Sequence, residues 1–145
     1  MYQRHQYGFT LIELIIVIGL FALLVAFGLP VAGNLYTDYV LISERDQFLA
    51  ILRKTRNQAL TNLDAQSHGV HIASTSYTVF EGATWAGRIQ DKDENISRSS
   101  AVTMNGTSDI VFTALSGITA STSWNLSNGI KISHVTVNSE GTINW

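Results

Sequence analysis

The sequence predicts an α+β fold in which one long N-terminal helix carries a small β-rich head. Three stretches of the 145 residues indicate this. Residues 9–33 hold 19 apolar positions of 25, and residues 38–60 have the spacing of an amphipathic helix. Residues 61–145 break into short alternating runs and contain 24 Ser or Thr. We therefore expect the helix to pack on a small antiparallel sheet.

The composition excludes several classes of protein. The formal net charge is −2 and the pI is about 6.0, without a basic block, so no large electrostatic footprint for nucleic acid is expected. Cysteine is absent, which excludes a disulfide scaffold, thiolate chemistry and cysteine-ligated zinc. The length fits one domain with one membrane segment better than a two-domain enzyme.

The first element, residues 9–33, is long enough to cross a bilayer. An uncharged run of 24 residues separates Glu13 from Asp38, and about 20 apolar residues span a hydrocarbon core. Arg4 precedes the run, so the positive-inside rule places the N-terminus in the cytoplasm and residues 34–145 outside it. A cleaved secretory signal and a plain anchor are the alternatives.

Two residues distinguish this segment from a plain anchor. Glu13 places a carboxylate in the apolar run, at a cost of roughly 2.5–3.5 kcal/mol by insertion scales, so it should have a partner. Pro30, flanked by Gly28 and Gly33, lacks the backbone donor of a helix interior and predicts a kink or a loosened turn.

Residues 8–15 read GFTLIELI, which resembles the cleavage and methylation motif of type IV prepilins and type II secretion pseudopilins. The resemblance implies that residues 1–8 are a leader peptide, that a prepilin peptidase cuts after Gly8, and that the new amino group of Phe9 is N-methylated. It implies a type IV pilin-like fold in which residues 9–33 form a transmembrane and filament-assembly helix. It also places Pro30 where many pilins carry a helix-kinking proline.

The same resemblance implies an assembly role for Glu13. Cleavage after Gly8 exposes a cationic amine close to this carboxylate, and the two charges can neutralise each other through a charge-assisted hydrogen bond. In these families the glutamate pairs with the N-terminus of a neighbouring subunit, and such a buried pair is suited to fixing register. A pair within one chain is the alternative. The implied partners are other pilin or pseudopilin subunits, the peptidase and methyltransferase, and an inner-membrane assembly platform.

The helix is expected to continue through residues 34–60 as an amphipathic segment that ends at the β-rich head, residues 61–145. Its apolar face is predicted to contain Leu41, Phe48, Leu52 and Ala59. The charged residues are expected largely elsewhere; they are Glu44, Asp46, Arg53, Lys54 and Arg56. The basic cluster among them is interpreted as a solvated face rather than a contact for acidic lipid or nucleic acid.

Six strands are predicted in the head. They are His68–Ala73, Ser76–Glu81, Ala101–Met104, Asp109–Ala114, Ile130–Val137 and Thr142–Trp145. A hairpin connection is expected at residues 73–76, and Asn128-Gly129 is a strong turn signal. The polar stretch 91–100 is expected to be a surface loop.

Residues 52–62, followed by a strand, are similar to the minor pseudopilin H and FimT-like family, as is the late glycine before a final strand in residues 130–145. The resemblance implies a structural minor subunit of a type II secretion pseudopilus or a type IV pilus, in the bacterial inner membrane and then in the filament. The alternative is a FimT-like minor pilin that binds DNA for uptake. Residues 101–145 contain Lys131 as their one firm positive charge, which disfavours DNA.

No catalytic motif, cofactor or metal site is expected. His68 and His71 would point to opposite faces of one strand and cannot share a ligand sphere there. Asp91, Asp93 and Asn95 match the first half of a calcium loop, but Ile96 stands where that loop needs glycine, so they are a weak calcium candidate. The absence of a Gly-x-Ser-x-Gly elbow argues against a serine hydrolase, and we expect no enzyme activity.

Overall fold

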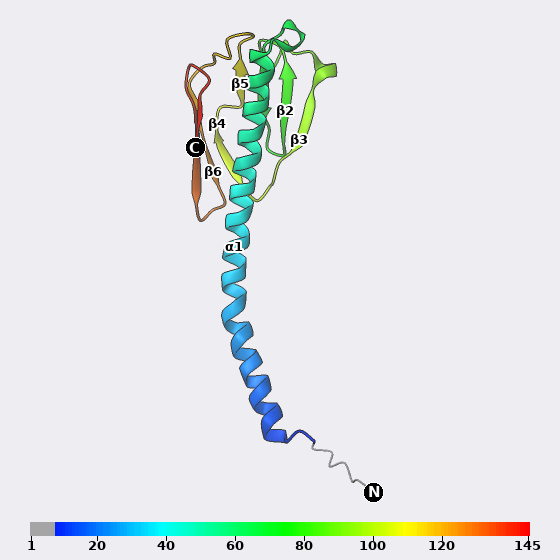
Figure 1. The fold of residues 1–145 in the computed structure, drawn as a ribbon, viewed down its shortest axis with the longest axis vertical. Coiled ribbons are helices and arrows are strands. Elements are labelled where there is room, and N and C mark those ends of the chain that lie inside the picture. Colours follow the sequence, from blue (N-terminus) through cyan, green and yellow to red (C-terminus); the bar gives the residue numbers. More distant parts are fainter. Residues whose placement is uncertain (1–7) are drawn as a thin grey trace. The chain divides into compact units, whose positions relative to one another are not determined.

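The computed structural model describes residues 8–145, except for the side chains of residues 27–34. One long helix precedes a head made of short strands (Figure 1). The helix is α1 (Leu11–Leu60), and two short 3-10 helices are η1 (Leu63–Ala65) and η2 (Gln90–Lys92). The strands are β1 (His68–Ile72), β2 (Ser76–Glu81), β3 (Glu94–Ser97), β4 (Thr103–Gly106), β5 (Asp109–Phe112), β6 (Thr122–Ser127), β7 (Ile132–Val137) and β8 (Ile143–Asn144).

The α+β class is confirmed, and it is consistent with a pilin-like fold. Contacts divide the chain into residues 1–36 and 37–145. The second unit therefore contains residues 37–60 of α1, called here the outer part of α1, together with all the strands. The helix is continuous through position 30, but the side chain of Pro30 lies outside the described ones, and the expected kink stays a prediction.

The segment expected to cross the membrane, residues 9–33, lies partly outside the described side chains, so it stays a prediction. No helix in the described part of the chain is both long and apolar enough to cross a bilayer.

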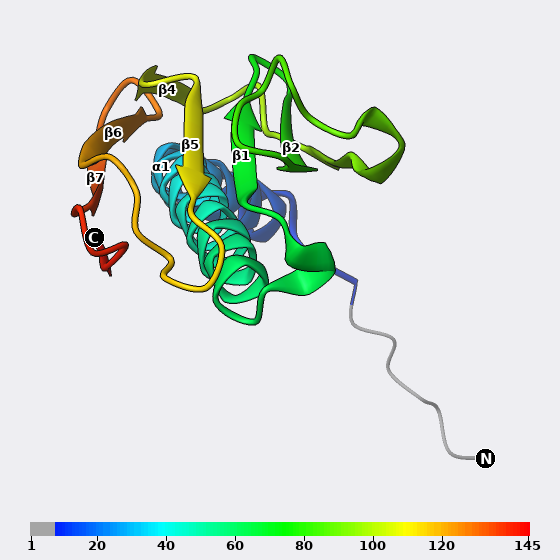
Figure 2. The same ribbon diagram turned by 90° about the horizontal axis from the view of Figure 1, so that it is seen from above.

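The prediction of a single sheet is wrong, because the head contains two antiparallel four-stranded sheets. Their strand orders are β3-β2-β1-β5 and β4-β6-β7-β8. Seen from above, β1 and β2 lie on one side of the outer part of α1 and β6 and β7 on the other (Figure 2). The two sheets therefore lie on different sides of the outer part of α1.

Most predicted strands are found with shifted ends. The predicted hairpin joins β1 to β2, and Asn128-Gly129 joins β6 to β7, with Gly129 at a φ of +86° that favours glycine. The strand predicted at residues 101–104 begins instead at Thr103. Strand β6 was not predicted, and β3 lies in the stretch expected to be a loop.

The core joins the helix to both sheets through Phe48. Its ring stacks on Tyr77 of β2 with centroids 5.3 Å apart, and it meets the ring of Trp124 in β6 edge-on at 5.2 Å. All four residues predicted on the apolar face of the helix, Leu41, Phe48, Leu52 and Ala59, are buried. Burial of aromatic surface is a principal source of stability, so this one helical residue links the two sheets.

One charged residue of the helix departs from the prediction. Glu44 is not solvated but buried, with 3% of its surface exposed. Its Oε1 accepts a hydrogen bond of 2.8 Å from the Tyr77 hydroxyl, and its Oε2 accepts one of 3.1 Å from the Ser99 amide. The guanidinium Nε of Arg98 lies 3.9 Å from Oε1. The carboxylate is tolerated inside the head because these three groups replace its water.

Candidate functional site

The expected processing site lies immediately before α1. Gly8, Phe9 and Thr10 have no regular secondary structure, and the helix begins at Leu11. No atom outside its chain neighbours lies within 4 Å of the position where a side chain on Gly8 would begin. Phe9 is 85% exposed. The bond after Gly8 is therefore in an accessible, non-helical segment, which is the backbone state that a peptidase can bind.

The first turn of α1 explains part of the motif in physical terms. The Glu13 amide donates a hydrogen bond of 3.3 Å to the Thr10 hydroxyl, and the Leu14 amide donates one of 3.2 Å to the Thr10 carbonyl. Thr10 thus caps the helix, and Glu13 lies in the first turn, where the helix dipole favours a negative charge. This cap is not among the predicted features, although the spacing Thr-x-x-Glu is a known start signal for helices.

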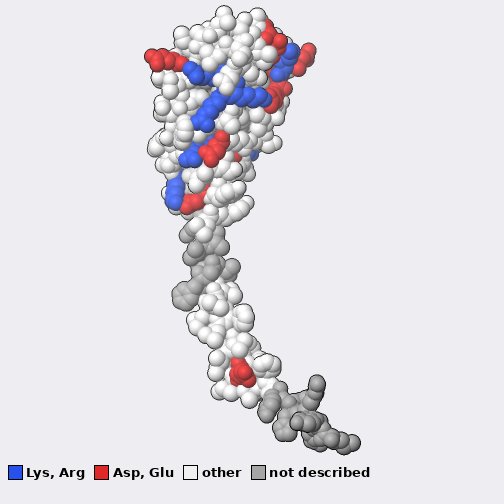
Figure 3. Space-filling model, viewed as in Figure 1, with Lys and Arg blue, Asp and Glu red and all other residues white. Residues whose placement is uncertain are grey.

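The helix beyond this turn is apolar on every side. Every described side chain from residue 8 to residue 26 is exposed, among them Phe21 at 64% and Leu24 at 70%. Glu13 is the one charged residue between positions 8 and 37. Ionic side chains gather instead on the head, where basic and acidic groups lie side by side (Figure 3). Water disfavours such an exposed apolar surface.

The structure gives the three residues of the weak calcium candidate different surroundings. Asp91 is exposed on η2, and Asp93 accepts a hydrogen bond of 2.8 Å from the Nε of Arg88. Asn95 accepts one of 2.6 Å from the Thr78 hydroxyl. Among the described residues no group of three or more His, Cys, Asp or Glu side chains could hold a metal ion. This geometry adds no support for calcium, which stays a prediction.

The histidines of β1 take separate roles in packing. His68 is buried, and its Nδ1 lies 3.1 Å from the Gln66 carbonyl. His71 is half-buried; its Nδ1 lies 2.6 Å from Asp109, and its ring stacks on Trp85 at 3.9 Å. The two side chains therefore contact different groups.

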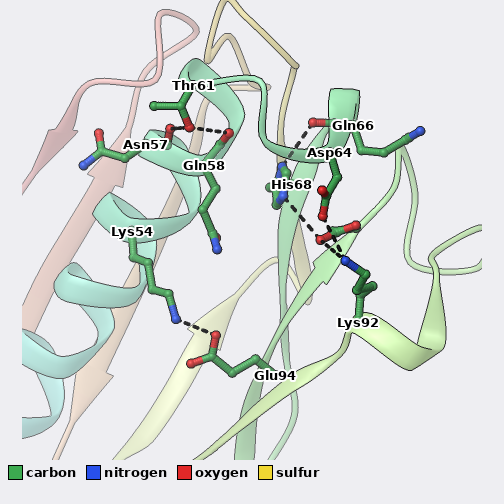
Figure 4. Close-up of polar contacts among 10 residues, drawn as sticks. Lys54, Asn57, Gln58, Thr61, Asp64, Gln66, His68, Lys92 and Glu94 are labelled. Carbon is green, nitrogen blue, oxygen red and sulfur yellow. Dashed lines mark hydrogen bonds and ion pairs between the residues drawn. The ribbon is translucent and has the colours of Figure 1, made fainter.

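A small ionic cluster lies at the end of the head, next to His68 (Figure 4). The Nζ of Lys92 lies 2.9 Å from Asp64 and 3.9 Å from Glu81. The hydrogen bond from Lys92 lowers the pKa of Asp64, and the same bond raises the pKa of Lys92. Because Asp64 and Lys92 are exposed, this pair contributes little to stability, but it holds η1 against η2.

The basic cluster on the outer part of α1 is only partly a solvated face. Lys54 donates a hydrogen bond of 2.5 Å to Glu94 of β3 (Figure 4). The guanidinium of Arg53 lies 4.4 Å from the ring centroid of Trp145, and Arg56 donates to the Glu140 carbonyl at 3.3 Å. Each of the three side chains therefore reaches a different part of the head.

One comparison with known proteins gave a match. Residues 3–29 match the family described as the prokaryotic N-terminal methylation motif. No match was found among curated proteins or among solved structures. The matched range contains the expected processing site and the capped first turn of α1. The motif supports a type IV pilin-like protein whose leader a prepilin peptidase removes.

Proposed function

We propose that this chain is a structural subunit of a type IV pilin-like filament. The observation that carries the proposal is the match of residues 3–29 to the methylation motif. The cleavage point that we propose, after Gly8, lies in the accessible segment before α1. The exposed apolar helix supports the same role, because filament assembly would cover a surface that water disfavours. No catalytic motif competes with this proposal, so we infer that the subunit is not an enzyme.

The proposed route begins in the bacterial inner membrane. Residues 9–33 anchor the precursor there, with the N-terminus in the cytoplasm and the head outside. Cleavage after Gly8 and methylation of Phe9 then give the mature N-terminus. In the filament, the Glu13 carboxylate pairs with the amino group of Phe9 in a neighbouring subunit, which fixes the register.

We further propose the minor pseudopilin H and FimT-like class, within a type II secretion pseudopilus or a type IV pilus. The support is the sequence similarity of residues 52–62 and 130–145 and the absence of cysteine. The DNA-binding alternative has less support, because Lys131, the firm cation of the C-terminal region, is paired with Asp38 at 2.5 Å. A gel shift with salt-sensitive binding by the full chain would favour that alternative.

Mass spectrometry of the membrane-extracted chain tests the proposal. In a host with a prepilin peptidase, the first residue should be N-methylated Phe9. Gly8→Leu should leave Met1 in place, because a large side chain fills the space next to the cleaved bond. Gly19→Ala is the matched control, since a Cβ there meets no atom within 4 Å outside its own helix turn. An intact Met1 in the unaltered chain would contradict the proposal.

A further inference from the structure

The basic residues of the head divide into two groups by their partners. The described part of the chain contains eight Lys and Arg residues, of which six form ion pairs with carboxylates. The paired residues are Arg45, Lys54, Arg88, Lys92, Arg98 and Lys131. The two without a carboxylate partner are Arg53 and Arg56, one turn apart on α1. The positive charge of the head that has no carboxylate partner therefore lies near the end of α1.

These two arginines line the same cavity, between the end of α1 and the approach to β8. The cavity has a volume of about 370 Å³, and no carboxylate lines it. Its other lining residues are Asn57, Gly141, Thr142 and Ile143. The ring of Trp145 holds the guanidinium of Arg53 at 4.4 Å by a cation–π contact. The cavity therefore combines two cations with an open space beside them.

Arg56 lines this cavity, and one of its hydrogen-bond donors has no partner. Its Nη2 donates to the Glu140 carbonyl, but its Nε is buried and has no hydrogen-bond partner. Gly141, at a φ of +76°, makes the close packing possible, because a Cβ there would lie 2.8 Å from this Nε. A second chain cannot reach this buried donor, so a carboxylate or phosphate oxygen in the cavity would meet the rest of the guanidinium fork, whose planar geometry suits such oxygens.

The carboxylates of the described chain offer few candidates to fill the cavity. Three of the side-chain carboxylates have no Lys, Arg or His partner, namely Glu13, Asp91 and Glu140. Glu140 belongs to the turn that forms the cavity, and Glu13 lies in the proposed assembly segment. Asp91 is exposed on η2, before the edge strand β3. The strand β8 is the edge of the other sheet, on the opposite side of the head (Figure 1).

We propose that the cavity formed by Arg53 and Arg56 binds the Asp91 carboxylate of a second copy of this chain. The contact joins opposite edges of two heads, so it is heterologous and can repeat along an open helical assembly. It rests on the proposed function, since a filament brings the heads together. A carboxylate fits better than a nucleic-acid backbone, because two unpaired cations supply little phosphate-driven affinity.

The absence of cysteine allows a direct test by cross-linking. Two tagged full-length copies, one with Asn57→Cys and one with Gln90→Cys, are expressed together in a host with a prepilin peptidase. A short thiol-specific reagent should join them, whereas Asn57→Cys with Asn105→Cys, on β4, should give little product. The double variant Arg53→Gln and Arg56→Gln should reduce the yield of cross-linked product by up to roughly fivefold, which corresponds to the free energy of an exposed ion pair. Lys54→Gln, which alters a cation paired with Glu94, should not.

Charge exchange distinguishes the contact between Arg56 and Asp91 from other contacts between two heads. Arg56→Glu in one copy and Asp91→Arg in the other should each lower the yield, and the two together should restore it. Failure to restore it, or an unchanged yield with Asp91→Asn, would overturn the proposal. Unchanged cross-linking in the Arg53 and Arg56 variants would also overturn the proposal. Loss of salt-sensitive DNA binding in the same variants would then indicate that the cavity binds nucleic acid. A methylated Phe9 without cross-linking contradicts only the contact, and an intact Met1 with cross-linking contradicts only the filament role.

Discussion

The hydroxyl of Tyr77 donates a hydrogen bond of 2.8 Å to the carboxylate of Glu44, and both residues are buried between the helix and the first sheet. Arg98 completes the cluster, since its guanidinium donates to the Ala73 and Val102 carbonyls and lies 3.9 Å from Glu44. Buried ionic groups are destabilising unless every partner is present. The cluster therefore joins the helix, the first sheet and the connection to the second sheet in one unit.

Tyr77→Phe should destabilise the head by about 1.5–3 kcal/mol, because it removes a hydrogen bond to a buried charge and leaves a carboxylate oxygen unsatisfied. Urea unfolding of the detergent-solubilised chain, followed by tryptophan fluorescence, measures the change. Tyr39→Phe deletes the same atom from a side chain that is 70% exposed, and it should change the stability little. Equal effects of the two variants would show that the Glu44 contact adds nothing.

Stability should fall at alkaline pH because of the same pair. Burial and the neighbouring Glu44 raise the pKa of Tyr77 above its ordinary value of 10.0. The folded state then retains a proton that the unfolded state releases, so the contribution of Tyr77 is full below pH 10.0 and declines as pH rises above it. The decline is at most about 1.4 kcal/mol per pH unit. Urea midpoints between pH 9 and 11 should fall less steeply in Tyr77→Phe than in Tyr39→Phe, and parallel slopes would rule out this linkage.

Phe48→Ala should be among the most destabilising substitutions in the head, at about 3–5 kcal/mol. The ring contacts aromatic residues of both sheets, so its loss opens a cavity where the sheets and the helix meet. Ile42→Ala is the control, since Ile42 lies on the same helix but is 48% exposed. Calorimetry that finds similar melting temperatures for these two variants would contradict a shared core at Phe48.

Periodicity predicted the helix and most strands because each of these elements buries several apolar residues at regular spacing. Strand β3 contains one apolar residue, Ile96, and pairs with a neighbour on one side only, so its short run was indistinguishable from a loop. Strand β6 alternates Trp124 and Leu126 inward, but only these two side chains are buried. A second sheet depends on how strands pair over long distances, which local patterns do not encode.

The same reasoning misplaced Glu44, because charged residues were expected in solvent. Its position three residues after Leu41 and four before Phe48 already puts it on the apolar face. The partners that permit its burial, Tyr77 and Arg98, come from other elements of the fold. The processing motif could be identified without the structure because it is a local signal, whereas the cavity at Arg53 and Arg56 depends on the turn that contains Gly141.

Glu13→Ala and Glu13→Gln should both be cleaved and methylated, because the cleaved bond lies in the non-helical segment before α1 and the Thr10 cap uses the backbone amide of residue 13. Both variants should enter filaments poorly if the carboxylate pairs with the amino group of Phe9 in a neighbouring subunit. Glu13→Asp keeps the charge and should retain more incorporation than either. Immunoblots of sheared filaments against the membrane fraction measure the distribution, and normal recruitment of Glu13→Gln would contradict the charge pairing.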